Sequence, residues 1–220
     1  MEHIGKVLGN LGRETHTPNL KTYEPDNTPS LEERREHLRQ SLGVSSLEHA
    51  FKNFRRVAGT QDAYNSFKAL AEGKTDNKLL LCYGGVGNGK TYLCEAASIA
   101  LYKRGIFCRV MSMARIMRGL KNSMNKNNLT PFDVLLDRYC YAERLIIDDV
   151  GMGGSGSEWE FGQLEEIIVT RYRERLFTIL TTNRDLTELP GRIVSRFADR
   201  EIGGIVLNGG KDFRLLKARG

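Results

Sequence analysis

Apolar positions along the chain follow two spacings, which together predict strands alternating with helices. Short apolar runs of strand length occupy residues 79–83, 106–113, 144–150, 176–183 and 204–209. Apolar residues recur at helical spacing in segments 61–73, 93–100, 114–124, 131–139 and 157–175, and in a helix that ends at 197. Alternating strands and helices imply a parallel sheet with helices on both faces, so we expect an α/β fold.

The first 45 residues carry a weaker pattern than the rest. Residues 1–30 hold three of the five prolines and few large apolar side chains, which predicts a mobile tail that orders only against a partner. We therefore expect two parts, an N-terminal extension over 1–45 and a main domain over 46–220.

A capping-box pattern, Ser30 followed by Glu33, opens a charged helix over residues 31–44. Its apolar stripe is narrow and consists of Leu31, Leu38 and Leu42. Such a stripe suits either a helix that packs on the main domain or a docking helix for another protein, and the sequence leaves both open. The dense pattern over 46–57 predicts a further helical segment.

Composition favours a soluble, cytoplasmic protein. The 220 residues are enough for one domain with its own core. No apolar run approaches the roughly 20 residues of a membrane-spanning helix, and the N-terminus lacks the apolar stretch of a signal peptide. The four cysteines form no C-x-x-C pair and lie in or beside apolar runs, which predicts buried reduced thiols rather than disulfides or a zinc site.

The net charge of +6 is unevenly distributed. Residues 1–45 hold six Lys or Arg against seven Asp or Glu, so the positive excess lies in the main domain. That is where a polyanion would have to bind, although a bound nucleotide would explain part of the excess.

A glycine-rich turn separates the first predicted strand from the helix that follows. Such a turn points backbone N–H groups at a common centre, at the positive end of a helix dipole, and so binds phosphate. Gly84-x-x-x-x-Gly89-Lys90-Thr91 is the P-loop pattern, in which Lys90 would reach the β- and γ-phosphates and Thr91 would ligate Mg²⁺. The predicted ATP-binding residues are Gly84, Gly85, Val86, Gly87, Asn88, Gly89, Lys90, Thr91 and Tyr92.

Two adjacent carboxylates, Asp148 and Asp149, end the apolar strand RLIIDDV. Side chains at the carboxyl ends of strands face the ligand crevice of an open α/β sheet. We predict that Asp148 holds the Mg²⁺ complex, and that Asp149 orients or deprotonates the attacking water.

One strand, FCRVMS, lies between the P-loop and the acidic pair in sequence, so we expect that the strands carrying these two motifs are not neighbours in the sheet. This argues against the arrangement of small-molecule kinases and GTPases and favours ATPases with an inserted strand. The run TILTTN suits that inserted strand, with Thr182 or Asn183 near the γ-phosphate or the lytic water.

Three arginines recur every four residues in GRIVSRFADR, which predicts one helical face carrying Arg192, Arg196 and Arg200. An arginine presented to a neighbouring subunit would act as an arginine finger that stabilises transition-state charge. We favour Arg196 over Arg192 for this role; a solvated basic face is the simpler alternative.

Basic residues also recur at three-residue spacing in the helix predicted over 114–124. Arg115, Arg118 and Lys121 could contact the phosphates of single-stranded DNA, with Lys126 beyond them. Phe132 and Tyr139 are the candidate stacking partners for bases, and the closing run KDFRLLKARG is also basic. Either basic cluster could equally be an ordinary solvated surface.

Taken together, the motifs resemble those of AAA+ ATPases of the DnaC/DnaI helicase-loader group and their IstB-type transposition relatives. The resemblance rests on GGVGNGKTYL, LIIDDVG, EWEFGQLEEIIVTRY leading to TILTTN, and RIVSRF, and covers about residues 46–220. It implies a P-loop NTPase fold of the AAA+ type and an ATPase that grips single-stranded DNA and delivers a replicative helicase.

The family resemblance also assigns roles to individual residues. It implies that Asn183 is the first sensor and that Arg196 acts in trans at an ATP site shared between subunits of a homo-oligomer. Three departures stand out. The second acidic residue is Asp149 rather than the glutamate of many AAA+ proteins, and no helical lid domain follows the last strand, as is usual in this group. The N-terminal extension is short and lacks the cysteines of those loaders that carry a zinc module there. If a helicase docks, residues 1–45 are the expected segment.

Three other functions fit parts of the pattern. An IstB-like regulator of transposition would share the core but act on duplex DNA. A small-molecule P-loop kinase is disfavoured by the predicted strand order, and a non-hydrolysing module would use ATP only for assembly.

Overall fold

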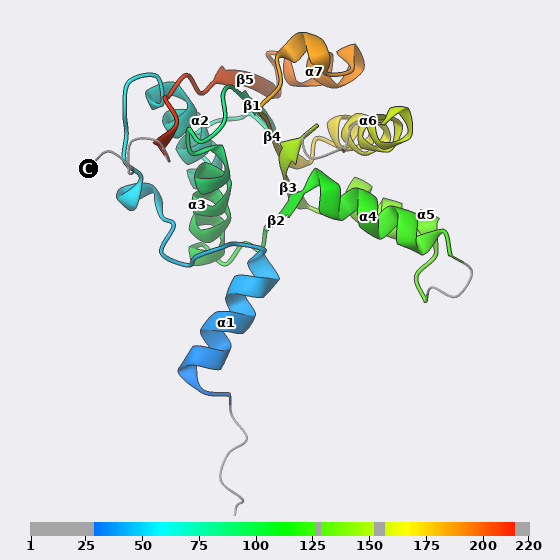
Figure 1. Ribbon diagram of the computed structural model, residues 1–220, viewed down its shortest axis with the longest axis horizontal. Helices are drawn as coiled ribbons and strands as arrows, with labels where there is room; N and C mark the ends of the chain where they lie inside the picture. The colour runs from blue at the N-terminus through cyan, green and yellow to red at the C-terminus, as the bar shows by residue number, and fades with distance from the viewer. Residues whose placement is uncertain (1–28, 126–128, 152–156, 214–220) are drawn as a thin grey trace, which may run out of the picture.

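The computed structural model describes residues 29–125, 129–151 and 157–213. Its centre is a five-stranded parallel sheet in the order β2-β3-β4-β1-β5 (Figure 1). The strands are β1 (Leu79–Tyr83), β2 (Arg109–Ser112), β3 (Arg144–Val150), β4 (Phe177–Thr182) and β5 (Gly203–Leu207). The strand β4 separates β1 from β3, so the predicted inserted-strand order is confirmed.

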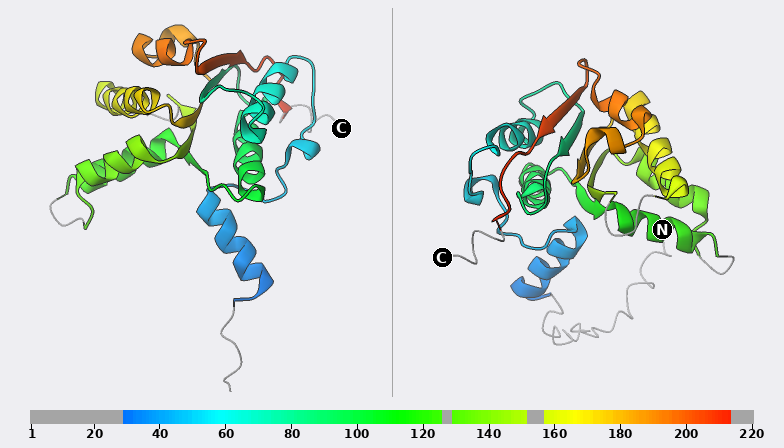
Figure 2. Two further views of the ribbon diagram at one scale, coloured as in Figure 1. Left: turned by 180° about the vertical axis from the view of Figure 1, so that it is seen from behind. Right: turned by 45° about the horizontal axis from the view of Figure 1, so that its top comes forward.

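Helices cover both faces of the sheet (Figure 2). One face carries α2 (Gln61–Glu72) and α3 (Lys90–Lys103); the other carries α4 (Met113–Ser123), α5 (Phe132–Tyr141), α6 (Glu158–Arg173) and α7 (Gly191–Phe197). Alternate residues of each inner strand serve opposite faces: on β1, Leu80 packs with α2 and α3, whereas Leu81 packs with the α4–α7 layer. The predicted α/β fold is therefore confirmed, and no helical lid domain is present among the described residues.

The pairing of β3 with β4 is irregular where the acidic pair lies. Ile147 pairs with Leu180, but the next aligned pair is Val150 with Thr182, so β3 carries an extra residue over this stretch. Such a bulge bends a strand and redirects its side chains. Asp148 and Asp149 occupy the bulge.

A fully buried arginine, Arg171 of α6, joins three elements of the α4–α7 side. Its guanidinium donates to the carbonyl oxygens of Tyr139 at 2.8 Å, Ala142 at 2.7 Å and Phe177 at 2.7 Å, and to Thr178 Oγ1 at 2.8 Å. Burial lowers the pKa of Arg171 to about 10. The side chain thus ties the end of α5 and the start of β4 to α6.

The prediction of a helix over residues 46–57 is wrong. Only a short 3₁₀ turn, η1 (Phe51–Asn53), forms there, and the residues before and after it are extended. The aromatic side chains explain the difference, because they pack into the core against α2 and α3 instead of lying along one face of a helix. Phe51 meets Tyr64 of α2 at 5.7 Å between ring centroids, and Phe54 meets Tyr92 of α3 at 5.3 Å.

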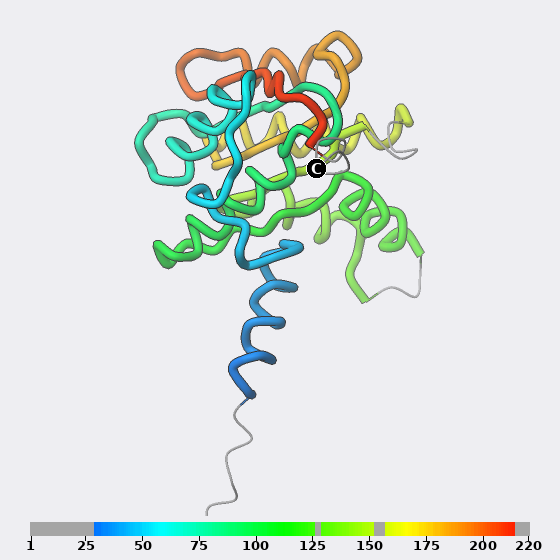
Figure 3. Tube along the Cα trace, turned by 60° about the vertical axis from the view of Figure 1, so that its left-hand side comes forward, coloured from blue at the N-terminus to red at the C-terminus, as the bar shows by residue number. Residues whose placement is uncertain are grey.

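The helix α1 (Leu31–Leu42) projects from the body and contacts it mainly through its C-terminal end (Figure 3). The predicted capping box of Ser30 and Glu33 is present, and Gly43 ends the helix in a left-handed conformation. Leu42 is buried and Leu38 packs against the same core, whereas Leu31 is 77% exposed, so two of the three residues of the predicted stripe pack on the main domain.

Some expectations fall on residues outside the described ranges. These are the tail up to residue 28, Lys126, and most of the basic C-terminal run. Among the described residues, no helix is long and apolar enough to cross a membrane.

Candidate functional site

The glycine-rich turn between β1 and α3 adopts a backbone path that requires glycine. Gly84, Gly87 and Gly89 have φ values of +136°, +69° and +92°, a region that L-residues with side chains rarely adopt. A Cβ added to Gly84 would lie 2.3 Å from the Asn208 carbonyl oxygen, and one added to Gly89 would lie 2.8 Å from the Phe54 ring. The loop can follow this path, directly before the N-terminus of α3, only because these three positions lack side chains.

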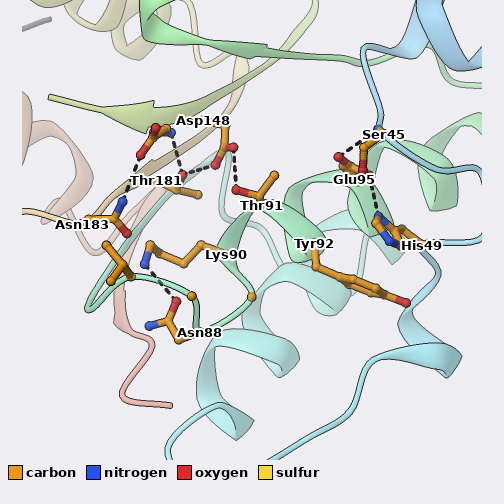
Figure 4. Close-up of a pocket in the computed structure, with 14 residues that line it drawn as sticks. Ser45, His49, Asn88, Lys90, Thr91, Tyr92, Glu95, Asp148, Thr181 and Asn183 are labelled. Atoms are coloured by element: carbon orange, nitrogen blue, oxygen red, sulfur yellow. Dashed lines mark hydrogen bonds and ion pairs between the residues drawn. The ribbon is translucent and has the colours of Figure 1, made fainter. Parts of the chain in front are cut away.

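Lys90, the first residue of α3, folds back over the loop. Its Nζ donates to the carbonyl oxygens of Gly84 at 2.8 Å and Gly85 at 2.6 Å, and to Asn88 Oδ1 at 2.9 Å (Figure 4). Burial lowers the pKa of Lys90, because the charged ammonium is poorly solvated there. Asn88 is in turn held by the buried Asn208 at the end of β5, to whose carbonyl oxygen it donates at 2.5 Å.

Asp148 is held in the centre of the site by hydroxyl groups from two elements. Thr91 of α3 donates to its Oδ2 at 2.8 Å, and Thr181 of β4 donates to its Oδ1 at 2.5 Å. The Sγ atom of Cys94 lies 3.7 Å from the same Oδ1. The structure therefore brings together the threonine and the carboxylate that the sequence predicts as Mg²⁺ ligands, and oxygen atoms of these two types suit that ion.

Asp149 points to the same cavity but is more exposed. Its backbone is in the left-handed region with φ +60°, and its amide donates to Thr181 Oγ1 at 3.1 Å. Asn183 Nδ2 donates to Asp149 Oδ1 at 3.0 Å. Of the two sensor candidates, Asn183 lines the cavity, whereas the Thr182 hydroxyl is turned to the Val150 carbonyl oxygen at 2.8 Å.

These groups line one cavity of about 400 Å³. Its far wall consists of side chains that sequence reasoning missed, namely Ser45, His49 and Glu95. Glu95 lies one helical turn after Thr91. A carboxylate on the buried face of a predicted helix was therefore the sequence signal that could have identified Glu95. Figure 4 shows how Glu95 points away from Asp148, toward Ser45 and His49.

The structure separates the three candidate finger arginines. Arg196 lies 5.0 Å from the centre of the Tyr172 ring, and the exposed Arg192 pairs with Glu165 at 2.9 Å. Arg200 lies beyond the end of α7 at Phe197, so the predicted single helical face of three arginines is wrong. The helix stops early because Asp199 binds Tyr172 and the chain turns into β5.

The predicted DNA-binding face of α4 is only partly free. Arg115 and Arg118 are exposed. Lys121 is also exposed but pairs with the buried Glu160 at 2.7 Å and lies 5.4 Å from the centre of the Trp159 ring. The two proposed stacking residues, Phe132 and Tyr139, are half-buried against the core, so the structure does not present them as free platforms.

Comparison with known proteins decides the family. The model of the bacterial DnaA ATPase domain matches residues 46–203, which is more than half of the chain. The chain belongs to the bacterial DnaA ATPase domain family. Its members are AAA+ ATPase domains of replication initiators, so the predicted AAA+ assignment is confirmed, while the narrower helicase-loader assignment stays a prediction.

Individual relatives agree with this DnaA-family assignment. The chromosomal replication initiator DnaA of Lactobacillus johnsonii is 29% identical over 205 residues, which is 88% of this chain but 42% of the relative. A structure of DnaA bound to AMPPCP and single-stranded DNA has a TM-score of 0.63 at 27% identity, over 78% of this chain and 54% of that one. The chain thus spans less than half the length of the curated DnaA proteins that it matches.

A structure of the DnaC helicase loader shares the fold of this DnaA-family domain. Its TM-score is 0.61 over 73% of this chain and 96% of that one, at 22% identity. Identity at this level shows the fold alone.

Proposed function

We propose that this domain binds and hydrolyses ATP in the cavity between the glycine loop and the acidic pair. One observation carries the proposal: Lys90, Thr91, Asp148, Asp149 and Asn183 come from three separate elements and converge on a single cavity. The solved relative with bound AMPPCP supports it.

Each residue has a chemical task in this proposal. The loop amides and the N-terminus of α3 bind the phosphates, while Lys90 exchanges its carbonyl partners for phosphate oxygens. Thr91 and Asp148 would hold Mg²⁺, which supplies charge neutralisation on the phosphates when bound. Asp149 orients the attacking water and takes up its proton, and Asn183, which donates to Asp149, fixes that carboxylate.

We further propose that the protein acts in DNA replication on single-stranded DNA, as a helicase loader of the DnaC/DnaI type. The single-stranded DNA in the solved DnaA relative supports the choice of nucleic acid. Arg115 and Arg118 provide the exposed cationic face for it. The segment 1–45 is the proposed docking site for a replicative helicase.

Assembly completes the proposal. None of the three candidate arginines is among the described residues that line the cavity. An ATP-dependent homo-oligomer in which Arg196 reaches the neighbour's ATP site would supply the missing positive charge. For that role Arg196 would leave the Tyr172 ring.

The testing experiment measures ATP turnover by the full chain with single-stranded DNA, with duplex DNA and without DNA. The parent is compared with the variants Asp149→Asn and Arg196→Ala, and with Glu143→Ala as a surface control, since that side chain is 85% exposed. We expect turnover that single-stranded DNA stimulates and that both site variants reduce by at least about 100-fold. If both variants release phosphate as fast as the parent, the assigned roles are refuted. Stimulation by duplex DNA alone would favour a transposition regulator.

A further inference from the structure

A buried carboxylate, Glu95, lies on the far wall of the cavity and has no assigned task in ATP binding or hydrolysis. Only 3% of Glu95 is exposed, and it stands one turn after Thr91 on α3. Its oxygens accept from the Ser45 amide at 3.0 Å, the Ser45 hydroxyl at 3.0 Å and His49 Nδ1 at 2.6 Å. All three donors come from residues 43–50, the connection between α1 and the body, which we call the strap.

The strap has a second attachment to the same helix. The His49 ring lies on the Tyr92 ring with 4.3 Å between centroids, and the Tyr92 hydroxyl donates to the Ala50 carbonyl oxygen at 3.1 Å. Tyr92 directly follows Thr91 at the start of α3. Both attachments therefore bind the strap to the first turns of the helix that carries the phosphate-binding lysine and threonine.

Burial makes the contact at Glu95 sensitive to its donors. A buried carboxylate is tolerated only when hydrogen bonds replace the water that it has lost, and hydrogen bonds to a charged group are the stronger kind. If the strap moves away, Glu95 loses these three donors together. Movement of the strap therefore must change the surroundings of α3 close to Thr91.

The strap also determines where α1 sits. Leu42 and Val44, at the junction of α1 and the strap, are buried in the core formed by α2, α3 and the sheet. Leu38 packs against the same core, whereas the N-terminal part of α1 projects from the body, with Leu31 exposed. Because Leu42 and Val44 lie next to Ser45 in the chain, a molecule that displaced α1 from this core would also displace the strap.

We propose that Glu95 is a positioning residue that couples α1 to the ATP site through the strap. Nucleotide binding fixes the first turns of α3 and thereby stabilises the attachment of the strap and α1 to the body. Because such coupling is reciprocal, displacement of α1 weakens nucleotide binding by the same factor by which bound nucleotide strengthens this attachment. This inference rests on the proposed ATP site. It would let a protein docked on α1 change nucleotide affinity without touching the cavity.

The test measures backbone hydrogen exchange of residues 31–50 in the full chain, with and without the analogue AMPPCP, together with the analogue's affinity. We compare the parent with Glu95→Ala, Glu95→Gln and the exposed control Glu143→Ala. In the parent and the control, we expect the analogue to slow exchange in the strap. In Glu95→Ala, we expect that slowing to disappear and affinity to fall by about 5-fold or more.

Glu95→Gln keeps the volume and one acceptor oxygen but loses the charge and the second acceptor, so we expect only part of both effects to be restored, whereas a merely space-filling role would be restored fully. If Glu95→Ala does not fold, the Gln variant alone must show reduced slowing and reduced affinity. Equal slowing and equal affinity in parent and variants would overturn the inference while leaving the ATP site intact. If the parent fails to bind the analogue, the proposed function is wrong, and the inference falls with it.

Discussion

Replacing the buried Arg171 by methionine should destabilise the fold without touching the ATP site. Methionine fills much of the same volume but donates no hydrogen bonds. The change leaves the carbonyl oxygens of Tyr139, Ala142 and Phe177, and the Thr178 hydroxyl, without their guanidinium donor. Because these groups end α5 and begin β4, loss of the donor loosens α6 from both elements.

The size of the effect follows from two opposing terms. Four hydrogen bonds to a charged group contribute about 6–12 kcal/mol before desolvation is counted. Removing the buried charge returns several kcal/mol, because burial already disfavours the ionised form, as the lowered pKa of Arg171 shows. We therefore expect a net loss of about 3–5 kcal/mol, which for a chain of this length lowers the Tm by about 6–20 °C.

Thermal unfolding followed by circular dichroism measures this loss. Arg173→Met is the matched control, since Arg173 lies on the same helix and is exposed, and it should change stability by no more than about 0.5 kcal/mol. Arg171→Lys keeps a charge but cannot reach the acceptors at the end of α5 and in β4 at once, so its Tm should lie between those of Arg171→Met and Arg173→Met. A Tm for Arg171→Met within about 2 °C of the parent would refute the reasoning.

Three further changes test other contacts. Thr181→Val removes the hydroxyl that binds both Asp148 and the Asp149 amide, so we expect a stability loss of about 2–3 kcal/mol and slower ATP turnover; unchanged melting and turnover would contradict this. Tyr172→Phe removes the main cause of the lowered pKa of Asp199, so NMR titration should find that pKa raised. A lowered carboxyl pKa stabilises the fold above the unfolded pKa, and this stability is lost as pH falls through the folded pKa, so the stability that Asp199 loses in acid should become smaller in the variant. An unchanged pKa of Asp199 would contradict this. A double Arg115→Ala, Arg118→Ala change should weaken binding of single-stranded DNA and reduce its salt slope by about 1.4, whereas the exposed Lys103→Ala should not, and an unchanged slope would argue against the α4 face.

The glycine-rich turn that we propose binds phosphate could be predicted from sequence because its signal is local. Gly84 to Thr91 form a continuous segment whose glycines, lysine and threonine are fixed by the same short turn. The position of Asp148 close to this turn could be predicted for a related reason, since Asp148 lies at the end of an apolar strand. The sequence also predicted that β1 and β3 are not neighbours in the sheet, because another strand lies between their two motifs along the chain, and β4 does separate them.

The far wall of the cavity could not be found in this way. Ser45 and His49 meet Glu95 across 50 and 46 positions of sequence, and no short pattern marks such a contact. The same limit explains the wrong helix over 46–57, whose aromatic residues are spaced for packing against α2 and α3 rather than for a helical face. Tertiary packing decided both outcomes.

The left-handed backbone at Asp149 restricts which acid can occupy the end of this strand. Aspartate is among the few residues with side chains that adopt this conformation readily, because its short carboxylate can hydrogen-bond locally. Glutamate is less stable at the same φ, so replacing Asp149 by glutamate would favour a flatter bulge, in which the amide of residue 149 no longer donates to Thr181. The choice of acid in this chain is thus linked to backbone shape, and exchanging the carboxylate would also reshape the strand that presents it.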